Sequence, residues 1–423
     1  MDSETLSLIT IPLFTGGIGY VTNWSGVWML FYPVHFRGVR VPGLKGLANV
    51  LPRRIQQIPG ILQGGLGWQG IVPSRAGKMG SIAAEKGISK LGGPSDFYDR
   101  LDSEAIAEHV LESAGGEIHE VVERIMEREQ PQLWHDLPQR LRDAVHARVS
   151  EQLPAIIRVV TDEVGAHVDQ LLNVKLMVIG HLEANPELAN RIFLEVGRKE
   201  LRFIIRFGFV FGFLLGIPTA FLTVEVWTMW WLLPIIGVLI GYTTNLLGIR
   251  MIFEPIRPRR IGPLTVQGLF IKRQPEVAGV YADIIADDIV TIDNMAEDLL
   301  HGPNADRTRR MIDLALRPVL DEAVGRARAA VRVAVGRREY DAIRSSIAEE
   351  ATDRTIAPLT DPEFARAQSR GIREFVAAQV REMDAPDFSE MLRTAMREDE
   401  WLLYLHGAVL GFGAGLLHLA IFG

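Results

Sequence analysis

Residues 241–255 read GYTTNLLGIRMIFEP, and residues 19–33 read GYVTNWSGVWMLFYP. Both stretches are apolar enough to form membrane helices, and they share eight of fifteen positions in the same register. Such recurrence indicates an internal repeat. The residues found in both stretches are Gly19, Tyr20, Thr22, Asn23, Gly26, Met29, Phe31 and Pro33, then Gly241, Tyr242, Thr244, Asn245, Gly248, Met251, Phe253 and Pro255.

The apolar residues of the chain are concentrated in four long stretches. Hydrophobic residues make up 48% of the 423 residues, and the mean hydropathy is +0.14. A membrane helix needs about 20 apolar residues, which predicts spans from Leu6 to Phe31, Phe203 to Val224, Trp227 to Phe253 and Trp401 to Phe422. Glycines and Asn23 interrupt the first stretch, so it is open between a full span and a broken or re-entrant segment.

The stretches between the spans are polar and show helical periodicity. We therefore predict an all-α integral membrane protein with two tandem pseudo-symmetric repeats, each with membrane helices flanking a long helical polar domain. The predicted parts are a first membrane segment (1–33), a first polar domain (34–200), a membrane hairpin around Glu225 with interfacial tryptophans (201–255), a second polar domain (256–400) and a fourth span (401–423).

Two further motifs recur in the same order. The block Gln69, Gly70 and Arg75 matches Gln267, Gly268 and Arg273. The last helix of each copy has glycines every four residues, which lets membrane helices approach closely. Whether these glycines pack within one chain or between chains is open. They are Gly208, Gly212 and Gly216 in the first copy and Gly407, Gly411 and Gly415 in the second.

These motifs together resemble a bacterial membrane family designated only as a domain of unknown function, number four-four-five. The resemblance covers nearly the full chain and rests on G-Y-x-T-N ending in M-[LI]-F-x-P, on Q-G-x-x-x-x-R and on the glycine helix. It implies a membrane protein with helical polar domains and supplies no biochemical activity. The copies also differ, since Trp24 becomes Leu246 and Trp28 becomes Arg250.

The paired polar residues inside the apolar helices have two interpretations. Asn23 and Asn245, with Thr22 and Thr244, lie within predicted spans. A carboxamide in lipid needs hydrogen-bond partners. One interpretation is hydrogen bonding between helices, and the other is a polar site in a substrate path.

Basic residues follow the first and third spans, which predicts cytoplasmic polar domains and termini outside. The resemblance to a bacterial membrane family implies the inner membrane as the location. The second cluster comprises Arg257, Arg259, Arg260, Lys272 and Arg273. It either binds anionic lipid headgroups or only marks the topology.

Several function classes are disfavoured. The chain has no cysteine, which excludes thiolate metal sites and a cysteine nucleophile. Its net charge of −7 argues against a nucleic-acid surface. No H-E-x-x-H, Walker or G-x-S-x-G motif is found. We therefore expect no enzyme activity, no cofactor, no metal and no nucleic-acid partner.

An apolar stripe from Leu137 to Leu171 predicts a long amphipathic helix that needs another helix or another chain alongside. We therefore expect membrane lipids and further copies of the chain as partners. The leading hypothesis is a homo-oligomeric scaffold or conduit, whose cargo would be lipid or another amphiphile. The alternative is a small-solute channel or transporter with a mid-membrane polar site at the paired asparagines.

Overall fold

A computed structural model describes residues 3–44, 46, 50–56, 58–222, 229–324, 336, 338, 341–343, 345–347, 350 and 357–422. The chain forms two compact units. The first comprises Met1–Gly87, Ile179–Tyr281 and Gln379–Gly423, and the second comprises Ile88–Val178 and Ala282–Ala378. Each unit therefore takes residues from both of the polar stretches.

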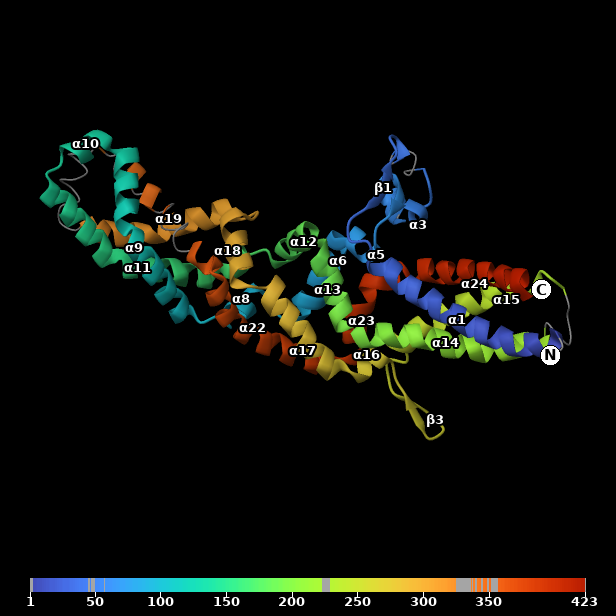
Figure 1. Cartoon of the computed structure of the whole chain (residues 1–423). Coiled ribbons are helices and arrows are strands. Elements are labelled where there is room, and N and C mark those ends of the chain that lie inside the picture. Colours follow the sequence, from blue (N-terminus) through green and yellow to red (C-terminus); the bar gives the residue numbers. More distant parts are fainter. Residues whose placement is uncertain are drawn as a thin grey trace. The chain divides into compact units, whose positions relative to one another are not determined.

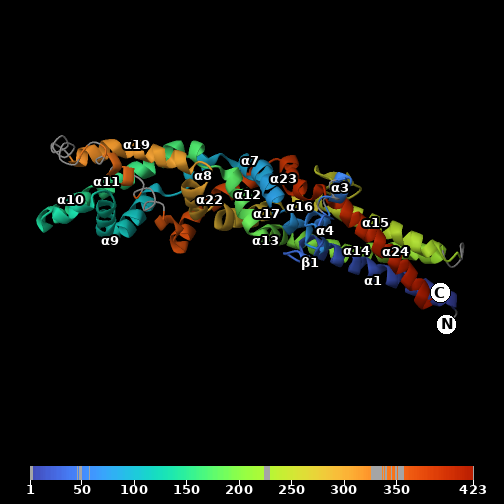
Figure 2. The same ribbon diagram turned by 90° about the horizontal axis from the view of Figure 1, so that it is seen from above.

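The first unit contains a bundle of four long helices. These are α1 (Ser3–Phe31), α14 (Arg198–Phe221), α15 (Leu232–Phe253) and α24 (Glu400–Phe422). Helix α1 lies along α14, and α15 lies along α24 (Figures 1 and 2). The start of α1 and the end of α24 lie at the same end of the bundle. An arrangement of this kind returns the chain to the side from which it began.

Three of these helices are long and apolar enough to cross a membrane: Arg198–Phe221, Leu232–Phe253 and Glu400–Ile421. Helix α1 is one continuous helix of 29 residues with Pro12 inside it. The first apolar segment is thus one unbroken helix over its described residues. The predicted turn around Glu225 and Trp227 lies outside the described residues, and Trp230 and Trp231 beside it are exposed.

The described chain is mostly helical, as predicted, and it also has four short strands in the segments that follow α1 and α15. After α1, β1 (Arg37–Arg40) pairs antiparallel with β2 (Gly65–Trp68). After α15, β3 (Arg259–Ile261) pairs antiparallel with β4 (Leu264–Val266). Both segments contain several glycine and proline residues, which favour turns over helix. The elements between β1 and β2 are α3 (Arg53–Gln56) and α4 (Pro59–Leu62).

Shorter helices make up the rest of the first unit, and some of them extend into or belong to the second. They are α5 (Ile71–Ser74), α6 (Ala76–Ile82), α7 (Ser89–Leu91), α12 (Val174–Ala184), α13 (Pro186–Val196), α16 (Leu269–Lys272), α17 (Gln274–Ile284) and α23 (Ala385–Arg397). Of these, α7 belongs to the second unit, and α12 and α17 each include residues of both units. π-Helical turns over Ala83–Ile88 and Ile285–Ile289 follow α6 and α17. Helix α13 packs on α5, α6 and α14, and α23 packs on α6 and α16.

The second unit is a helical assembly around α11 (Gln139–Leu171). It contains α8 (Pro94–Tyr98), α9 (Ser103–Glu129), α10 (Pro131–Asp136), α18 (Ile292–His301), α19 (Ala305–Val324), a 3₁₀ turn (Ala357–Thr360) and most of α22 (Pro362–Glu382). Helix α11 packs against α9 and α19 of the same chain. Leu153, Val160 and Val168 of the predicted stripe are buried there. Within the described residues, most of the stripe is therefore covered without a second chain.

Candidate functional site in the membrane bundle

Both glycine rows form close contacts inside the bundle. A β-carbon at Gly212 would lie 2.6 Å from the Thr15 carbonyl oxygen, and one at Gly216 would lie 2.6 Å from the Pro12 α-carbon. In α24, a β-carbon at Gly415 would lie 2.5 Å from the α-carbon of Pro234, while Gly411 contacts the Gly237 carbonyl. The question left open by the sequence is thereby answered for these faces. Each row packs on a helix of the same chain, so the α24 row offers no free face to another chain.

The two buried asparagines make matching hydrogen bonds between helices. The Asn23 amide nitrogen donates to the Ile204 carbonyl at 2.6 Å, and the Asn245 amide nitrogen donates to the Leu403 carbonyl at 2.6 Å. A β-carbon on Gly208 or Gly407 would lie 2.6 Å from Asn23 Nδ2 or Asn245 Nδ2, respectively. The first glycine of each row thus leaves the space that the asparagine side chain occupies.

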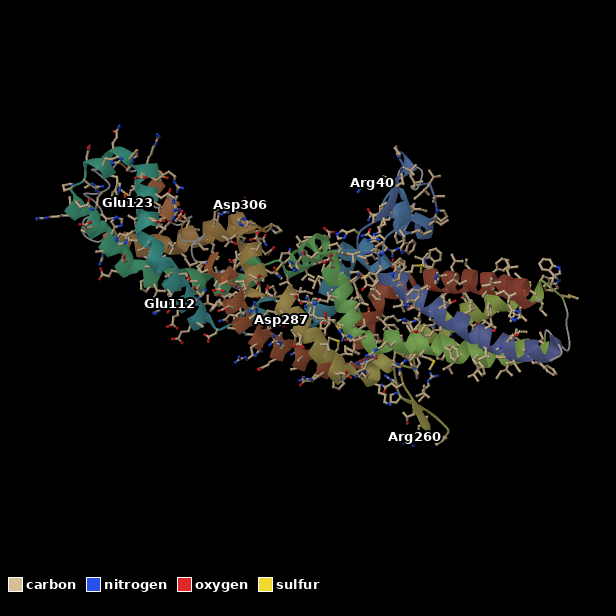
Figure 3. The ribbon with its side chains drawn as sticks, viewed as in Figure 1. Arg40, Glu112, Glu123, Arg260, Asp287 and Asp306 are labelled. Atoms are coloured by element: carbon tan, nitrogen blue, oxygen red, sulfur yellow. The ribbon has the colours of Figure 1, made fainter. Side chains whose placement is uncertain are left out.

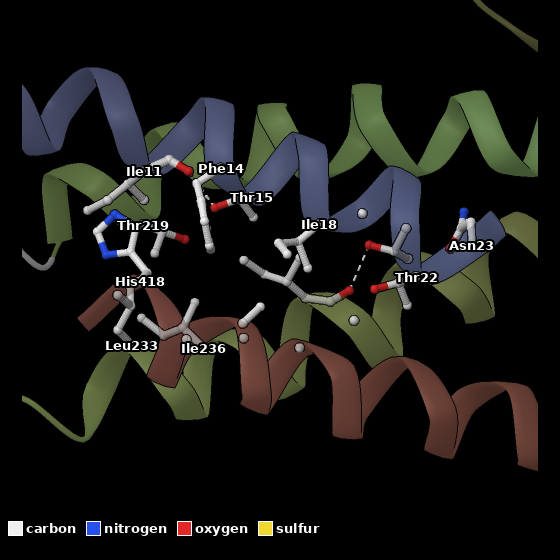
Figure 4. Close-up of a pocket in the computed structure, with 18 residues that line it drawn as sticks. Ile11, Phe14, Thr15, Ile18, Thr22, Asn23, Thr219, Leu233, Ile236 and His418 are labelled. Carbon is white, nitrogen blue, oxygen red and sulfur yellow. Dashed lines mark hydrogen bonds between the residues drawn. The ribbon is translucent and has the colours of Figure 1, made fainter. Parts of the chain in front are cut away.

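The interior of the bundle holds two cavities, each with about 50 Å³ of space for water. The first lies between all four helices and is lined mainly by apolar side chains (Figure 4). Its polar lining residues include Thr15, Thr22, Thr244 and His418. The second is lined by both asparagines and Glu200. Asn23 lines both cavities. A space of this size is large enough for a few waters.

Two residues that line the second cavity, Asn23 and Glu200, each have a buried oxygen atom without a hydrogen-bond donor. Asn23 Oδ1 and Glu200 Oε2 accept no hydrogen bond from the protein. Asn23 is 2% exposed, and Glu200 is 2% exposed. A buried acceptor without a donor costs about 1–3 kcal/mol, so these oxygens suit a water or another small hydrogen-bond donor. Thr244 Oγ1, in contrast, donates to the Ile240 carbonyl of its own helix at 2.7 Å.

Two ion pairs lie near the same end of the bundle. Arg75 pairs with Asp399 immediately before α24, and Arg273 pairs with Glu200 in the first turn of α14. The Asp399 and Glu200 side chains are 3% and 2% exposed. Burial raises the pKa of Asp399, while the Arg75 guanidinium opposes that rise. Arg75 follows the β1–β2 hairpin and pairs at the start of α24, in the second half of the sequence. Arg273 follows the β3–β4 hairpin and pairs at the start of α14, in the first half.

The same backbone contacts precede each arginine. Gln69 Nε2 donates to the Val34 carbonyl at 2.7 Å, and Gln267 Nε2 donates to the Ile256 carbonyl at 3.2 Å. The next residue, Gly70 or Gly268, donates its backbone N–H to Pro33 or Pro255. The peptide bond before each of these prolines is cis. The Q-G-x-x-x-x-R motif thus closes each hairpin segment and presents the arginine to its carboxylate.

The five basic residues of the predicted lipid cluster occupy different places. Arg257, Arg259 and Arg260 are exposed at the β3–β4 hairpin, and Lys272 is exposed on α16. Arg273 instead donates to Glu200 and, at 2.9 Å, to Glu276. Arg273 and then Lys199 lower the pKa of Glu276 to about 2. The Arg273 charge is therefore directed at carboxylates of the protein. Sequence reasoning found the Q-G-x-x-x-x-R motif but could not identify Asp399 or Glu200 as its partners.

No protein-family model and no solved structure matches the chain. The chain is similar to a UPF0754 membrane protein of Synechococcus elongatus, 39% identical over 100 residues, which are 23% of this chain and 21% of the relative. A UPF0754 membrane protein of Staphylococcus haemolyticus is 26% identical over 150 residues, 34% of this chain and 38% of the relative. The chain thus spans well under half the length of these curated relatives. Their names describe membrane proteins and give no activity, which agrees with the membrane bundle.

Proposed function

We propose that the chain is a non-enzymatic membrane scaffold, in which the glycine-packed bundle fixes helical polar segments at the membrane surface. The observation that carries this proposal is the doubled clamp, Arg75 with Asp399 and Arg273 with Glu200. Buried ion pairs contribute little net stability compared with apolar packing, but they can specify one arrangement. A protein that only anchors a flexible segment to the membrane would need no such pairs. A scaffold, in contrast, needs each polar segment to leave the helix bundle in a fixed direction.

The recurring contacts support a duplicated architecture as part of this proposal. Each half supplies a cis-proline segment, a hairpin, a clamp arginine and a glycine row that accommodates an asparagine. Each arginine pairs with a carboxylate of the opposite half. Two tandem copies joined in this way would each donate an arginine to a carboxylate of the other copy, and separation of the halves would break both ion pairs.

A conduit for lipid or another amphiphile would need several chains. The cavities inside one bundle have about 50 Å³ of space each, and glycine contacts close the helix pairs around them. These two cavities therefore do not by themselves support a passage for an acyl chain inside one bundle. We propose that copies of the chain assemble side by side and enclose the passage between them.

Exposed apolar residues on the polar helices support an amphiphilic cargo. Leu141 on α11 and Leu314 on α19 are 52% and 59% exposed. A photo-reactive amino acid at either position should capture an alkyne-tagged phospholipid in intact membranes, because a conduit brings the acyl chains to these side chains. The same amino acid at Glu112, an exposed polar position on α9 (Figure 3), should capture little. Equal labelling at all three positions, or none at Leu141 and Leu314, would count against a lipid conduit.

A small-solute channel is the second candidate, and one observation favours it. Asn23 lines both cavities, and its Oδ1 is a buried acceptor without a protein donor. A water-filled path along the bundle would pass this oxygen. Proteoliposomes should then show a solute or proton leak that Asn23→Leu abolishes and Gly413→Ala leaves unchanged. No leak in the wild-type protein would leave the asparagine with its hydrogen bond to Ile204 as its whole role.

We also propose that the protein lies in a bacterial inner membrane, with its polar segments in the cytoplasm. The start of α1 and the end of α24 would then lie outside the cytoplasm. The basic residues that follow α1 and α15 support this orientation.

A further inference from the structure

The β1–β2 and β3–β4 hairpins share a position in the first unit. Each follows a bundle helix, α1 or α15, after a short linker. In Figure 1 the two hairpins project sideways from the same end of the bundle, in opposite directions. Arg40 and Arg260 mark them in Figure 3. If the bundle axis follows the membrane normal, both hairpins extend along the membrane surface.

The charge of both hairpin segments has one sign. Residues 34–84 and 255–275 contain no aspartate or glutamate, although the whole chain has 52 acidic residues and a net charge of −7. The described arginines of the strands and their linkers are exposed: Arg37, Arg40, Arg257, Arg259 and Arg260. None of these five arginines forms an ion pair with a carboxylate of the described residues. A positive surface of this kind fits an anionic partner.

The first hairpin also has an exposed apolar face. Val39 and Leu66 are partners across the two strands, and each is 72% exposed. Adjacent apolar side chains with this exposure are unfavourable in water, where burial of apolar surface is the main stabilising contribution. Trp28 in the last turn of α1 and Tyr32 immediately after this helix are also exposed. Tryptophan and tyrosine concentrate at the membrane–water boundary, which places the hairpin at the level of the headgroups.

We propose that the two hairpins are membrane-surface anchors that bind anionic phospholipid headgroups of the leaflet beside the bundle. The arginines contact the phosphates, and Val39 and Leu66 insert between the upper parts of the acyl chains. Basic residues and apolar residues on one element are the combination that interfacial anchors use. An acidic protein partner is less well matched, because it would leave the Val39–Leu66 pair outside the bilayer to which the hairpin is adjacent.

The first test uses the absence of cysteine in the chain. Val39→Cys gives a single site for a nitroxide label in the full-length protein in lipid nanodiscs. We expect the label to be accessible to oxygen and protected from a water-soluble nickel complex, with greater protection when phosphatidylglycerol is present. A label at Glu112→Cys, an exposed polar position on α9 of the second unit, is the water-exposed control. A Val39 label that is open to the nickel complex in every lipid mixture overturns the proposal, as does protection without any response to phosphatidylglycerol.

The second test addresses the other hairpin. Arg257→Gln, Arg259→Gln and Arg260→Gln together should lower the amount of phosphatidylglycerol retained in native mass spectra at least about tenfold, because each basic residue near the surface contributes to headgroup binding. Arg158→Gln, at an exposed arginine of α11, is the matched control for loss of a positive charge. Retention that is the same in the triple variant and the control would show that these arginines only mark topology.

Discussion

Arg75 and Asp399 form a buried ion pair at the base of the membrane bundle, with Arg75 Nη1 2.5 Å from Asp399 Oδ2. The residues are 324 positions apart in the sequence. Arg273 and Glu200 form a second pair, in which Glu200 is buried and Arg273 is partly exposed. Each pair connects the segment after one hairpin to the base of a bundle helix. This connection fixes the helical segments relative to the bundle within the first unit.

Removal of one member of the first clamp should be more harmful than removal of both. Arg75→Met leaves Asp399 buried without its partner, and the expected loss is about 3–5 kcal/mol of unfolding free energy. The double variant Arg75→Met with Asp399→Leu replaces the pair by apolar side chains and should recover most of that loss. Thermal unfolding followed by intrinsic tryptophan fluorescence measures both. Equal stability of Arg75→Met and the wild type would show that the pair is not buried as described.

Substitution of glycines in α24 should lower the stability of the protein only on the helix face that packs against α15. Gly411 contacts the Gly237 carbonyl, whereas a β-carbon on Gly413 would meet nothing within 4 Å. Gly411→Leu should therefore separate α15 from α24 and lower stability by about 1–3 kcal/mol or more. Gly413→Leu, two positions away on the exposed face, should be neutral or slightly stabilising. If both variants unfold at the same temperature, the α15–α24 contact is not the one described.

Stability in acid should depend on Glu276. Its pKa is lowered from 4.5 to about 2, first by Arg273 and then by Lys199. A carboxyl whose pKa is lowered in the folded state stabilises that state above the unfolded pKa, and this contribution is lost as the pH falls through the folded value. The wild type should thus lose stability between pH 4.5 and 2, and Glu276→Gln should lose less over the same range. Parallel pH profiles for the two proteins would contradict this role of Glu276.

The orientation can be read with fusion reporters. A reporter after residue 423 should be active outside the cytoplasm, and one inserted in the 302–306 turn should be active inside. The basic residues after α1 and α15 are the reason for this expectation. The opposite pattern would place the helical segments outside, and it would also move the two hairpins to the outer leaflet.

The sequence predicted the helices α14, α15 and α24 well because their apolar length is a property of each segment alone. The glycine rows likewise indicated close packing, but the choice between a neighbour in the same chain and one in another chain depends on tertiary structure. Gly411 shows this, since its partner Gly237 is identified only by the fold.

The remaining parts of the site depend on contacts between distant segments. Nothing in the local sequence around Arg273 distinguishes a lipid-binding arginine from one that pairs with Glu200. The short strands were also missed, because β1 and β2 are separated by a glycine- and proline-rich insertion and pair through their backbones. The stripe on α11 predicted a helix correctly, yet α9 and α19 of the same chain cover much of it.

The mass of the complex in a mild detergent tests the proposed scaffold and conduit most directly. Native mass spectrometry or light scattering of the purified full-length chain should give an integral multiple of the 47.1 kDa protomer, and images should show a ring or tube with a central space. Repeated head-to-tail contacts close into rings when the rotation between protomers allows it. A single protomer of 47.1 kDa under the same conditions would contradict the conduit and leave a monomeric membrane module.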